Sequence, residues 1–276
     1  MTVAPRKSAH RTGPYEPIGG EPHMRLLCRI LSAALCAGLG ALAPTLALAQ
    51  AGPPLLTDDP GTPGDGHWEI NLAWTTERSD DLRVNELPLA DINFGVGERV
   101  QLKFELPWNA IDGRGTTANG FGNALAGVKW RFFDAGEHGW QLSTYPQAEF
   151  LMPGLHGSSL AEPGVGYLLP IEIQRDFGSI EAGAEVGRWM RPGVDTDSWI
   201  AGVAIGREVG EGVEVLGELH DECRVGDGAH ELVLNVGARR RLSEHFTLLA
   251  SLGSDLHNGI DRRNVLISYL ALQLTL

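Results

Sequence analysis

The chain is dominated by an alternation of apolar and polar residues with a period of two, the spacing of side chains along a β-strand. Its final stretch, Val265 to Leu276, places Leu270, Leu272, Leu274 and Leu276 on one face and small or polar residues on the other. An apolar strand face left in water promotes aggregation, so four leucines in register need a cover. The pattern favours lipid as that cover.

The same alternation recurs throughout residues 67–276 and predicts about twelve strands. The clearest case runs from Val100 to Trp108, where large apolar residues alternate with Gln101, Lys103 and Glu105. In a second strand, Val84 to Val96, the period places Leu87 on the polar face. Residues 140–150 are expected to form one strand. Residues 109–120 are polar and rich in glycine, and we expect them to form a long loop.

Short turns and longer loops alternate between the predicted strands. Sequences such as GER, DFG and GEG make tight turns, whereas residues 153–163 and 191–197 form longer connections. This asymmetry is typical of outer-membrane barrels, which have short turns on one side and longer loops on the other. The sequence therefore predicts an all-β fold, a single antiparallel transmembrane β-barrel of about 12 strands. The alternative is a soluble sandwich or lipocalin-like barrel, in which the apolar face points inward.

The N-terminal region divides into three segments. Residues 1–23 are polar and are expected to be a disordered extension or a wrongly assigned start. Residues 24–49 combine Arg25 and Arg29, an apolar run and a small-residue cleavage site, as a secretory signal peptide does. The alternative is a signal anchor, because the apolar run is nearly long enough to span a bilayer. Residues 50–66, rich in Pro, Gly and Asp, are expected to be a turn-rich periplasmic lead-in before the barrel of residues 67–276, and are long enough to enter its lumen as a plug.

Charge and cysteine content narrow the classes of function. From residue 50 onward the chain has 17 basic and 33 acidic residues, a net charge of −16, which excludes a general nucleic-acid binder. Only Cys223 remains after removal of the signal peptide, so an internal disulfide is excluded. No later segment is apolar for 18 residues or more, so the mature chain enters a membrane as strands or not at all.

One stretch resembles a known family. Pro53 to Ala73, PPLLTDDPGTPGDGHWEINLA, is similar to the opening of the outer-membrane transporter family named for the meta-pathway of phenol degradation. The positions that carry the resemblance are Thr57, Asp58, Asp59, Gly66, Trp68 and Glu69. The resemblance implies a barrel in the Gram-negative outer membrane and a transport role. In such a barrel both termini are expected on the periplasmic side.

If the apolar face meets lipid, the other face lines a lumen. The residues expected to line it are Glu69, Asp91, Lys103, Glu105, Lys129, Arg131, Glu149, Glu172, Glu181, Glu185, Glu214, Glu218, His220, Glu222 and Arg239. This lining is compatible with two hypotheses: an acidic pore for passive passage of small solutes, aromatic or cationic, and a structural barrel whose lumen is closed by paired charges. Lys103 and Glu105 are expected to form ion pairs across to the neighbouring strand, which carries Lys129 and Arg131.

Enzymatic function is not expected. No GxSxG, HExxH or paired CxxC motif occurs, and no outward-facing His and Ser pair suits a lipid-modifying enzyme. Asp58 and Asp59 before Pro60 favour an Asx-type turn over calcium binding, so neither a metal nor a cofactor is predicted. The expected partners are outer-membrane lipid, the barrel-assembly machinery through the C-terminal strand, and a small-molecule solute, but no nucleic acid.

Overall fold

The computed structural model describes residues 52–80, 82–113, 116–136, 138–152, 160, 164–191, 197–259 and 265–276. In these ranges the regular structure consists of fourteen strand segments. They are β1 (Trp68–Arg78), β2 (Leu82–Val96), β3 (Val100–Gly113), β4 (Thr116–Phe121), β5 (Ala124–Asp134), β6 (Trp140–Thr144), β7 (Gln147–Phe150), β8 (Val165–Asp176), β9 (Glu181–Met190), β10 (Ser198–Gly210), β11 (Val213–Arg224), β12 (His230–Arg241), β13 (Phe246–Asn258) and β14 (Leu266–Thr275). The same ranges contain no helix long and apolar enough to cross a bilayer. The extension and signal peptide predicted for residues 1–49 lie outside them.

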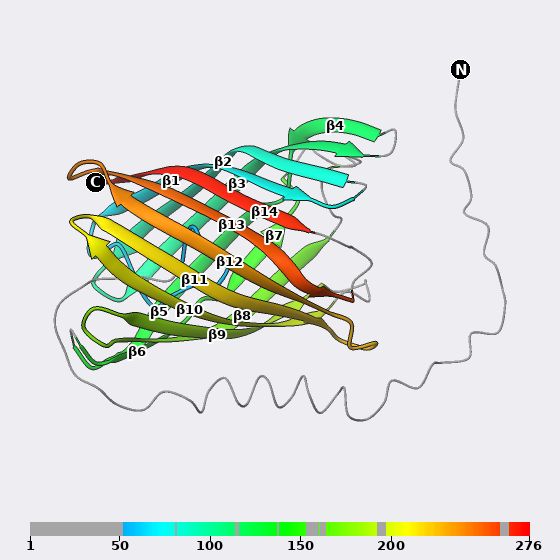
Figure 1. Cartoon of the computed structure of the whole chain (residues 1–276). Coiled ribbons are helices and arrows are strands. Elements are labelled where there is room, and N and C mark those ends of the chain that lie inside the picture. The colour runs from blue at the N-terminus through cyan, green and yellow to red at the C-terminus, as the bar shows by residue number, and fades with distance from the viewer. Residues whose placement is uncertain are drawn as a thin grey trace, which may run out of the picture.

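The strands form one closed antiparallel barrel (Figure 1). Its first and last strands pair over their full length, from Glu69 opposite Thr275 to Arg78 opposite Leu266. At one end of this seam the backbones of Trp68 and Leu276 exchange two hydrogen bonds of 2.9 Å. Because β4 and β5 together line one side of β3, and β6 and β7 together join β5 to β8, the fourteen segments make twelve barrel strands. The predicted twelve-stranded barrel is confirmed.

The two ends of the barrel differ. The end that holds Trp68 and Leu276, on the left in Figure 1, is called the termini end, and it carries the short turns at 97–99, 177–180 and 211–212. The opposite end is called the loop end and carries the longer connections, including those near 151–164 and 191–197. The alternation of short and long connections predicted from the sequence is therefore present, except at the first hairpin, where the connection between Arg78 of β1 and Leu82 of β2 is short although it lies at the loop end.

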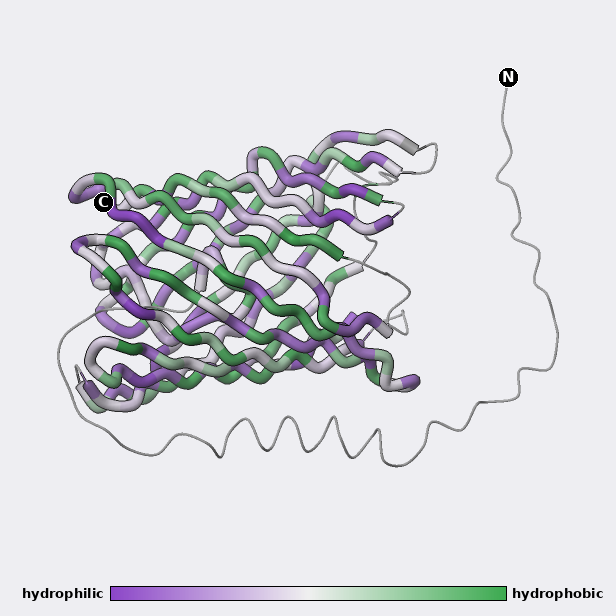
Figure 2. Tube along the Cα trace, viewed as in Figure 1, coloured by the Kyte–Doolittle hydropathy of each residue, from purple (hydrophilic) through white to green (hydrophobic). Residues whose placement is uncertain are grey.

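Successive side chains along each strand point alternately to the outside and to the inside of the barrel. Large apolar residues such as Leu72 (56% exposed), Trp130 (54%) and Ile205 (53%) point to the outside. Polar residues between them point inward and are buried, among them Asn71 and Glu172, each 0% exposed. Figure 2 shows the resulting change between apolar and polar residues along individual strands. The apolar face is thus the outer one, which contradicts the soluble alternative with an apolar interior.

Three local expectations were wrong. Leu87 is 54% exposed rather than inward, because the β2–β3 register shifts between Glu86 and Leu89 and turns it outward. Residues 109–120 are not a loop: β3 continues to Gly113 and pairs with β4 in a hairpin beyond the barrel wall, favoured by the β-branched Ile and Thr residues. The single strand expected over residues 140–150 is interrupted between β6 and β7, at Tyr145–Pro146, where proline has no N–H to donate.

The depth of an outward-facing residue in the membrane should determine how strongly a charge at that position destabilises the barrel, which gives a first prediction. Ile205 lies in the middle of the outer face of β10 and Val209 near its termini end. Replacing Ile205 by Arg should lower the free energy of unfolding in lipid vesicles by about 2–4 kcal/mol, and replacing Val209 by Arg by about 0–1 kcal/mol, because the cost of a cation falls toward the interface. Denaturant titration of both variants measures the difference. Equal losses at the two positions would contradict the lipid-facing assignment.

Candidate functional site in the barrel lumen

The segment before the first strand, residues 52–66, lies inside the barrel. It approaches the β2–β3 turn at the termini end, where Gly66 N donates to Gly95 O (3.0 Å) and Gly97 N to the Asp65 carboxylate (2.8 Å). Gly95 allows this approach, because a Cβ there would overlap the backbone of Gly64. The segment predicted as a lead-in, with a plug as the alternative, therefore occupies the termini half of the lumen from Gly52 onward.

Carboxylates of the wall hold the backbone of this segment. The two Glu218 oxygens accept the N–H groups of Leu56 and Thr57, each at 2.7 Å, and Glu185 accepts the N–H of Asp58 at 3.0 Å. Asn235 donates to Glu218 at 2.9 Å and fixes its orientation. Hydrogen bonds to an ionised group are the stronger ones, so these carboxylates dock the segment midway along β9 and β11.

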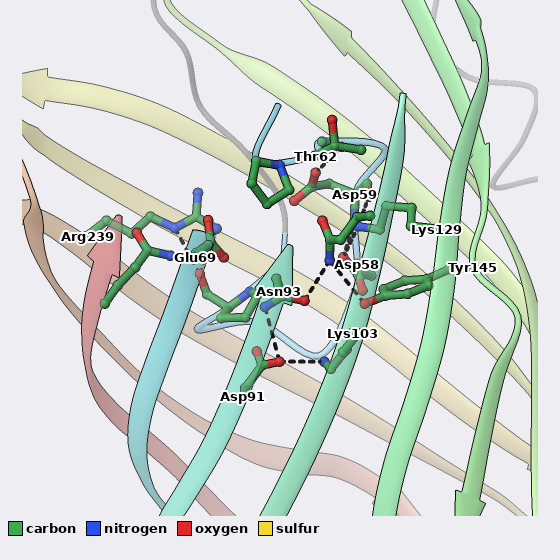
Figure 3. A pocket seen from close by; sticks show the side chains of 15 residues that line it. Asp58, Asp59, Thr62, Glu69, Asp91, Asn93, Lys103, Lys129, Tyr145 and Arg239 are labelled. Atoms are coloured by element: carbon green, nitrogen blue, oxygen red, sulfur yellow. Dashed lines mark hydrogen bonds and ion pairs between the residues drawn. The ribbon is translucent and has the colours of Figure 1, made fainter. Parts of the chain in front are cut away.

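Two basic side chains and a serine hydroxyl of the wall donate hydrogen bonds to the carbonyl groups of the inserted segment. Arg239 donates to Pro53 O from Nε (2.9 Å) and Nη2 (2.7 Å), while its Nη1 contacts Glu214 at 3.2 Å. Ser251 donates to Pro54 O at 2.7 Å. Lys129, 3% exposed, forms an ion pair with Asp58 (2.8 Å) and donates to the carbonyl of Asp59, as Figure 3 shows. The segment thus supplies partners of both signs to buried wall residues.

The two aspartates of the segment form the turn that the sequence predicted. Gly61 N donates to the Asp59 side chain two residues earlier, which is the Asx-type bond, and Asp59 N donates to the side chain of the adjacent Asp58 at 2.8 Å. Burial raises the pKa of Asp58, but the nearby Lys129 and Lys103 ammonium groups outweigh burial and hold that pKa below its ordinary value. Among the residues that the structure describes, no group of three or more His, Cys, Asp or Glu side chains suits a metal ion.

A polar network covers the opposite wall, on β1, β2 and β3. Lys103 lies between Asp91 (3.4 Å) and Glu105 (3.0 Å). Asp91 also accepts from Asn71 and Asn93, each at 3.1 Å. Gln101 continues the network, since it donates to Asn93 (2.7 Å) and to the Tyr145 hydroxyl (3.1 Å), whose ring lies under Lys129. The charges of this wall are paired with one another rather than with the inserted segment.

None of the fifteen residues predicted to line the lumen is exposed. The structure joins Asp91, Lys103 and Glu105 in one cluster and Lys129, Glu185, Glu214, Glu218 and Arg239 around the segment. The expected pairing of Lys103 and Glu105 with the Lys129 strand does not occur, because Lys103 lies opposite Gly127 in the β3–β5 register. The remaining predicted residues have separate contacts or surroundings: Arg131 with Asp134, Glu149 with Arg191 and Asn123, Glu172 with Ser143, Glu222 with Ser198, Glu69 at a cavity beside the segment, Glu181 buried and His220 half-buried.

Two cavities in the lumen are lined by residues that the structure describes. A lower cavity of about 110 Å³ separates the segment from the β1–β3 wall, and Figure 3 shows its lining of Asp58, Asp59, Glu69, Asp91, Lys103, Lys129 and Arg239. An upper cavity of about 490 Å³ lies toward the loop end. Its lining holds four carboxylates and one guanidinium, those of Glu77, Glu86, Glu105, Glu149 and Arg191, beside apolar Leu125 and Trp189.

Several residues that face the lumen are not among the fifteen predicted to line it. Asn93, Gln101 and Asn235 share the period of the predicted acids, so the alternation contains the signal that finds them. Glu77 does so as well, whereas Glu86 is out of phase with Asp91 and faces the lumen only because the β2–β3 register shifts between Glu86 and Leu89. No sequence signal identifies Gly202, where a Cβ would overlap the side chain of Thr57. The docking role of the Thr57–Asp59 turn also has no such signal, because its partners are distant in sequence.

A closed twelve-stranded barrel with an apolar outer face and a charged lumen has the architecture of the outer-membrane β-barrel class. The sequence matches no known protein-family profile and no curated protein, so the resemblance of residues 53–73 to a transporter family has no support from these comparisons. Solved structures do share the fold. An outer-membrane channel of Pseudomonas putida F1 has a TM-score of 0.63 and 14% identity, over 79% of this chain and 98% of that chain.

Two porins are also similar. The NanC porin has a TM-score of 0.56 and 10% identity, over 75% of this chain and 100% of that chain. The KdgM porin has a TM-score of 0.54 and 9% identity, over 75% of this chain and 98% of that chain. At these identities the similarity establishes the fold.

Docking of the segment can be tested at Gly202. Its replacement by Ala should displace Thr57 and free the Leu56 and Thr57 amides from Glu218. Loss of even one charge-assisted hydrogen bond, about 1.5 kcal/mol, would accelerate amide exchange roughly tenfold. Hydrogen-exchange mass spectrometry of the peptide that contains both residues provides the measurement.

Two further variants control this experiment. Thr57→Gly in the Gly202→Ala background removes the overlapping atoms and should restore protection of the peptide. Gly217→Ala on the adjacent β11 should change nothing, since its Cβ would lie 3.9 Å from the nearest atom. Unchanged exchange in Gly202→Ala would show that residues 55–58 are not docked against β10.

Proposed function

We propose that this protein is an outer-membrane channel for passive passage of small solutes, with cationic and neutral solutes favoured over anions. The observation that carries the proposal is a charge-lined lumen inside an apolar-coated barrel, with an upper cavity of about 490 Å³. The four carboxylates of that cavity face one guanidinium, and a cavity lined mainly by one sign of charge concentrates ions of the opposite sign. The similar structures are named as channels and porins, which supports this role.

The same proposal includes a location and partners. The apolar outer face would contact outer-membrane lipid, and both termini would lie on the periplasmic side, where short turns are expected. The C-terminal strand, which closes the barrel against β1, would be the segment recognised by the barrel-assembly machinery. Transport of aromatic solutes, implied by the family resemblance, has less support, because Trp189 and Tyr145 are the aromatic residues that line the two cavities.

A second candidate function is a structural barrel with a permanently closed lumen. It is favoured by the docked segment, whose backbone is bonded to Glu218, Glu185 and Arg239. Under this alternative the paired charges stabilise the interior and no solute crosses. The two candidates differ in whether the purified barrel conducts ions, and in whether removal of the segment opens it.

Deletion of residues 53–62 separates the candidates. Planar-bilayer recording should show small, cation-preferring channels for the wild type and a several-fold larger conductance for the deletion, because most of the segment that fills the termini half is gone. Liposome swelling with neutral sugars should rise in parallel. Heat-modifiable gel mobility verifies that both proteins are closed barrels. A closed barrel that conducts in neither form, or that prefers anions, would refute the channel proposed here.

A further inference from the structure

The two cavities approach each other at an ion pair. Lys103 lines the lower cavity, and its ammonium group is 3.0 Å from Glu105, which lines the upper one. On its other side the same ammonium group is 3.4 Å from Asp91, which belongs to the lower cavity. The side chains of Lys103 and Glu105 are 14% and 25% exposed, so both are accessible from the lumen.

The inserted segment is bound to the wall opposite this ion pair. Residues 54–58 are bound to β9, β11 and β13 through Glu185, Glu218 and Ser251. The lower cavity lies on the other side of the segment, along β1, β2 and β3, and reaches Glu69 and Gln273 near the termini end. With the segment docked, Lys103 and Glu105 therefore lie where the lower and upper cavities approach each other.

Charge differs above and below this ion pair. The upper cavity has an excess of carboxylates, four against the guanidinium of Arg191. In the lower cavity four carboxylates, from Asp58, Asp59, Glu69 and Asp91, face three cationic groups, from Lys103, Lys129 and Arg239. Lys129 and Arg239 are engaged with the segment, whereas Lys103 is bonded to Asp91 and Glu105 of the wall.

We propose that Lys103, held between Asp91 and Glu105, is the residue that sets ion preference in the docked channel, and that the docked channel passes water and small inorganic ions. This inference rests on the proposed channel function. The lower cavity, about 110 Å³, has room for only a few water molecules, so larger solutes require the segment to move. The carboxylates of the upper cavity attract cations, and the Lys103 ammonium group repels them. A charge in a confined site with few water molecules has more effect on a passing ion than the same charge in an open pore.

Two substitutions with opposite expected effects test the proposal. Lys103→Met leaves Asp91 and Glu105 without their ammonium partner and should raise the potassium-over-chloride permeability ratio several-fold. Glu105→Gln keeps the ammonium and removes one carboxylate, so that ratio should fall. Reversal potentials in a potassium chloride gradient give both values. Arg207→Met is the matched control, because Arg207 is exposed on the outer face of β10 and lines neither cavity, and its ratio should equal that of the wild type.

The outcomes separate this inference from the function it rests on. A barrel that conducts neither as the wild type nor after deletion of residues 53–62 refutes the proposed channel, whereas a silent wild type whose deletion variant conducts refutes this inference alone. A conducting wild type in which Lys103→Met and Glu105→Gln match Arg207→Met refutes the role of Lys103 alone. Each variant is first examined for heat-modifiable mobility, and if Lys103→Met does not form a barrel, the fall predicted for Glu105→Gln decides the question. A shift of the same sign in both variants also overturns the proposal.

Discussion

The closure of the barrel between β1 and β14 is the constraint on which the rest depends. In lipid a backbone N–H or C=O without a partner costs several kcal/mol, so a sheet that crosses the bilayer must have no free edge. The ten paired positions from Glu69 to Arg78, and the reciprocal bonds of Trp68 and Leu276, remove that edge. Closure also gives each strand a lipid face and a lumen face. Leu270 and Leu272 therefore lie outside, while Asn71 and Gln273 face the interior.

Closure concentrates charged residues in a narrow interior, and those charges need partners. Removing one partner of a buried ion pair typically destabilises a protein by about 3–5 kcal/mol. The lumen supplies partners in two ways. On the β1–β3 wall the side chains satisfy each other, as Asp91 does with Lys103 and two asparagines. On the β9–β13 side the inserted segment supplies backbone donors to Glu218 and Glu185, and backbone acceptors to Arg239. The segment is thus both an obstruction and part of the charge balance of the lumen.

The sequence predicted the features that depend on period and missed those that depend on tertiary contact. Alternation predicted most of the strands and which face of each is apolar, because both depend on neighbours two residues apart. It placed Leu87 on the wrong face, because a register shift breaks the period there. It assigned residues 109–120 to a loop, because a hairpin that extends past the barrel loses its apolar face. Docking at Glu218 joins residues more than 160 positions apart through backbone amides, and such a contact has no side-chain pattern.

The division of the lumen into a docking side and a passage side depends on where the acids lie. Glu185 and Glu218, on β9 and β11, accept backbone N–H groups of the segment, so the segment satisfies the acids of this side. On β2 and β3 Lys103 forms ion pairs with both Asp91 and Glu105, so these two acids have a partner within the wall. The lower cavity lies along the wall whose charges are paired internally. The acids and the lysine of these strands thus distinguish the side that binds the segment from the side along which the lower cavity lies.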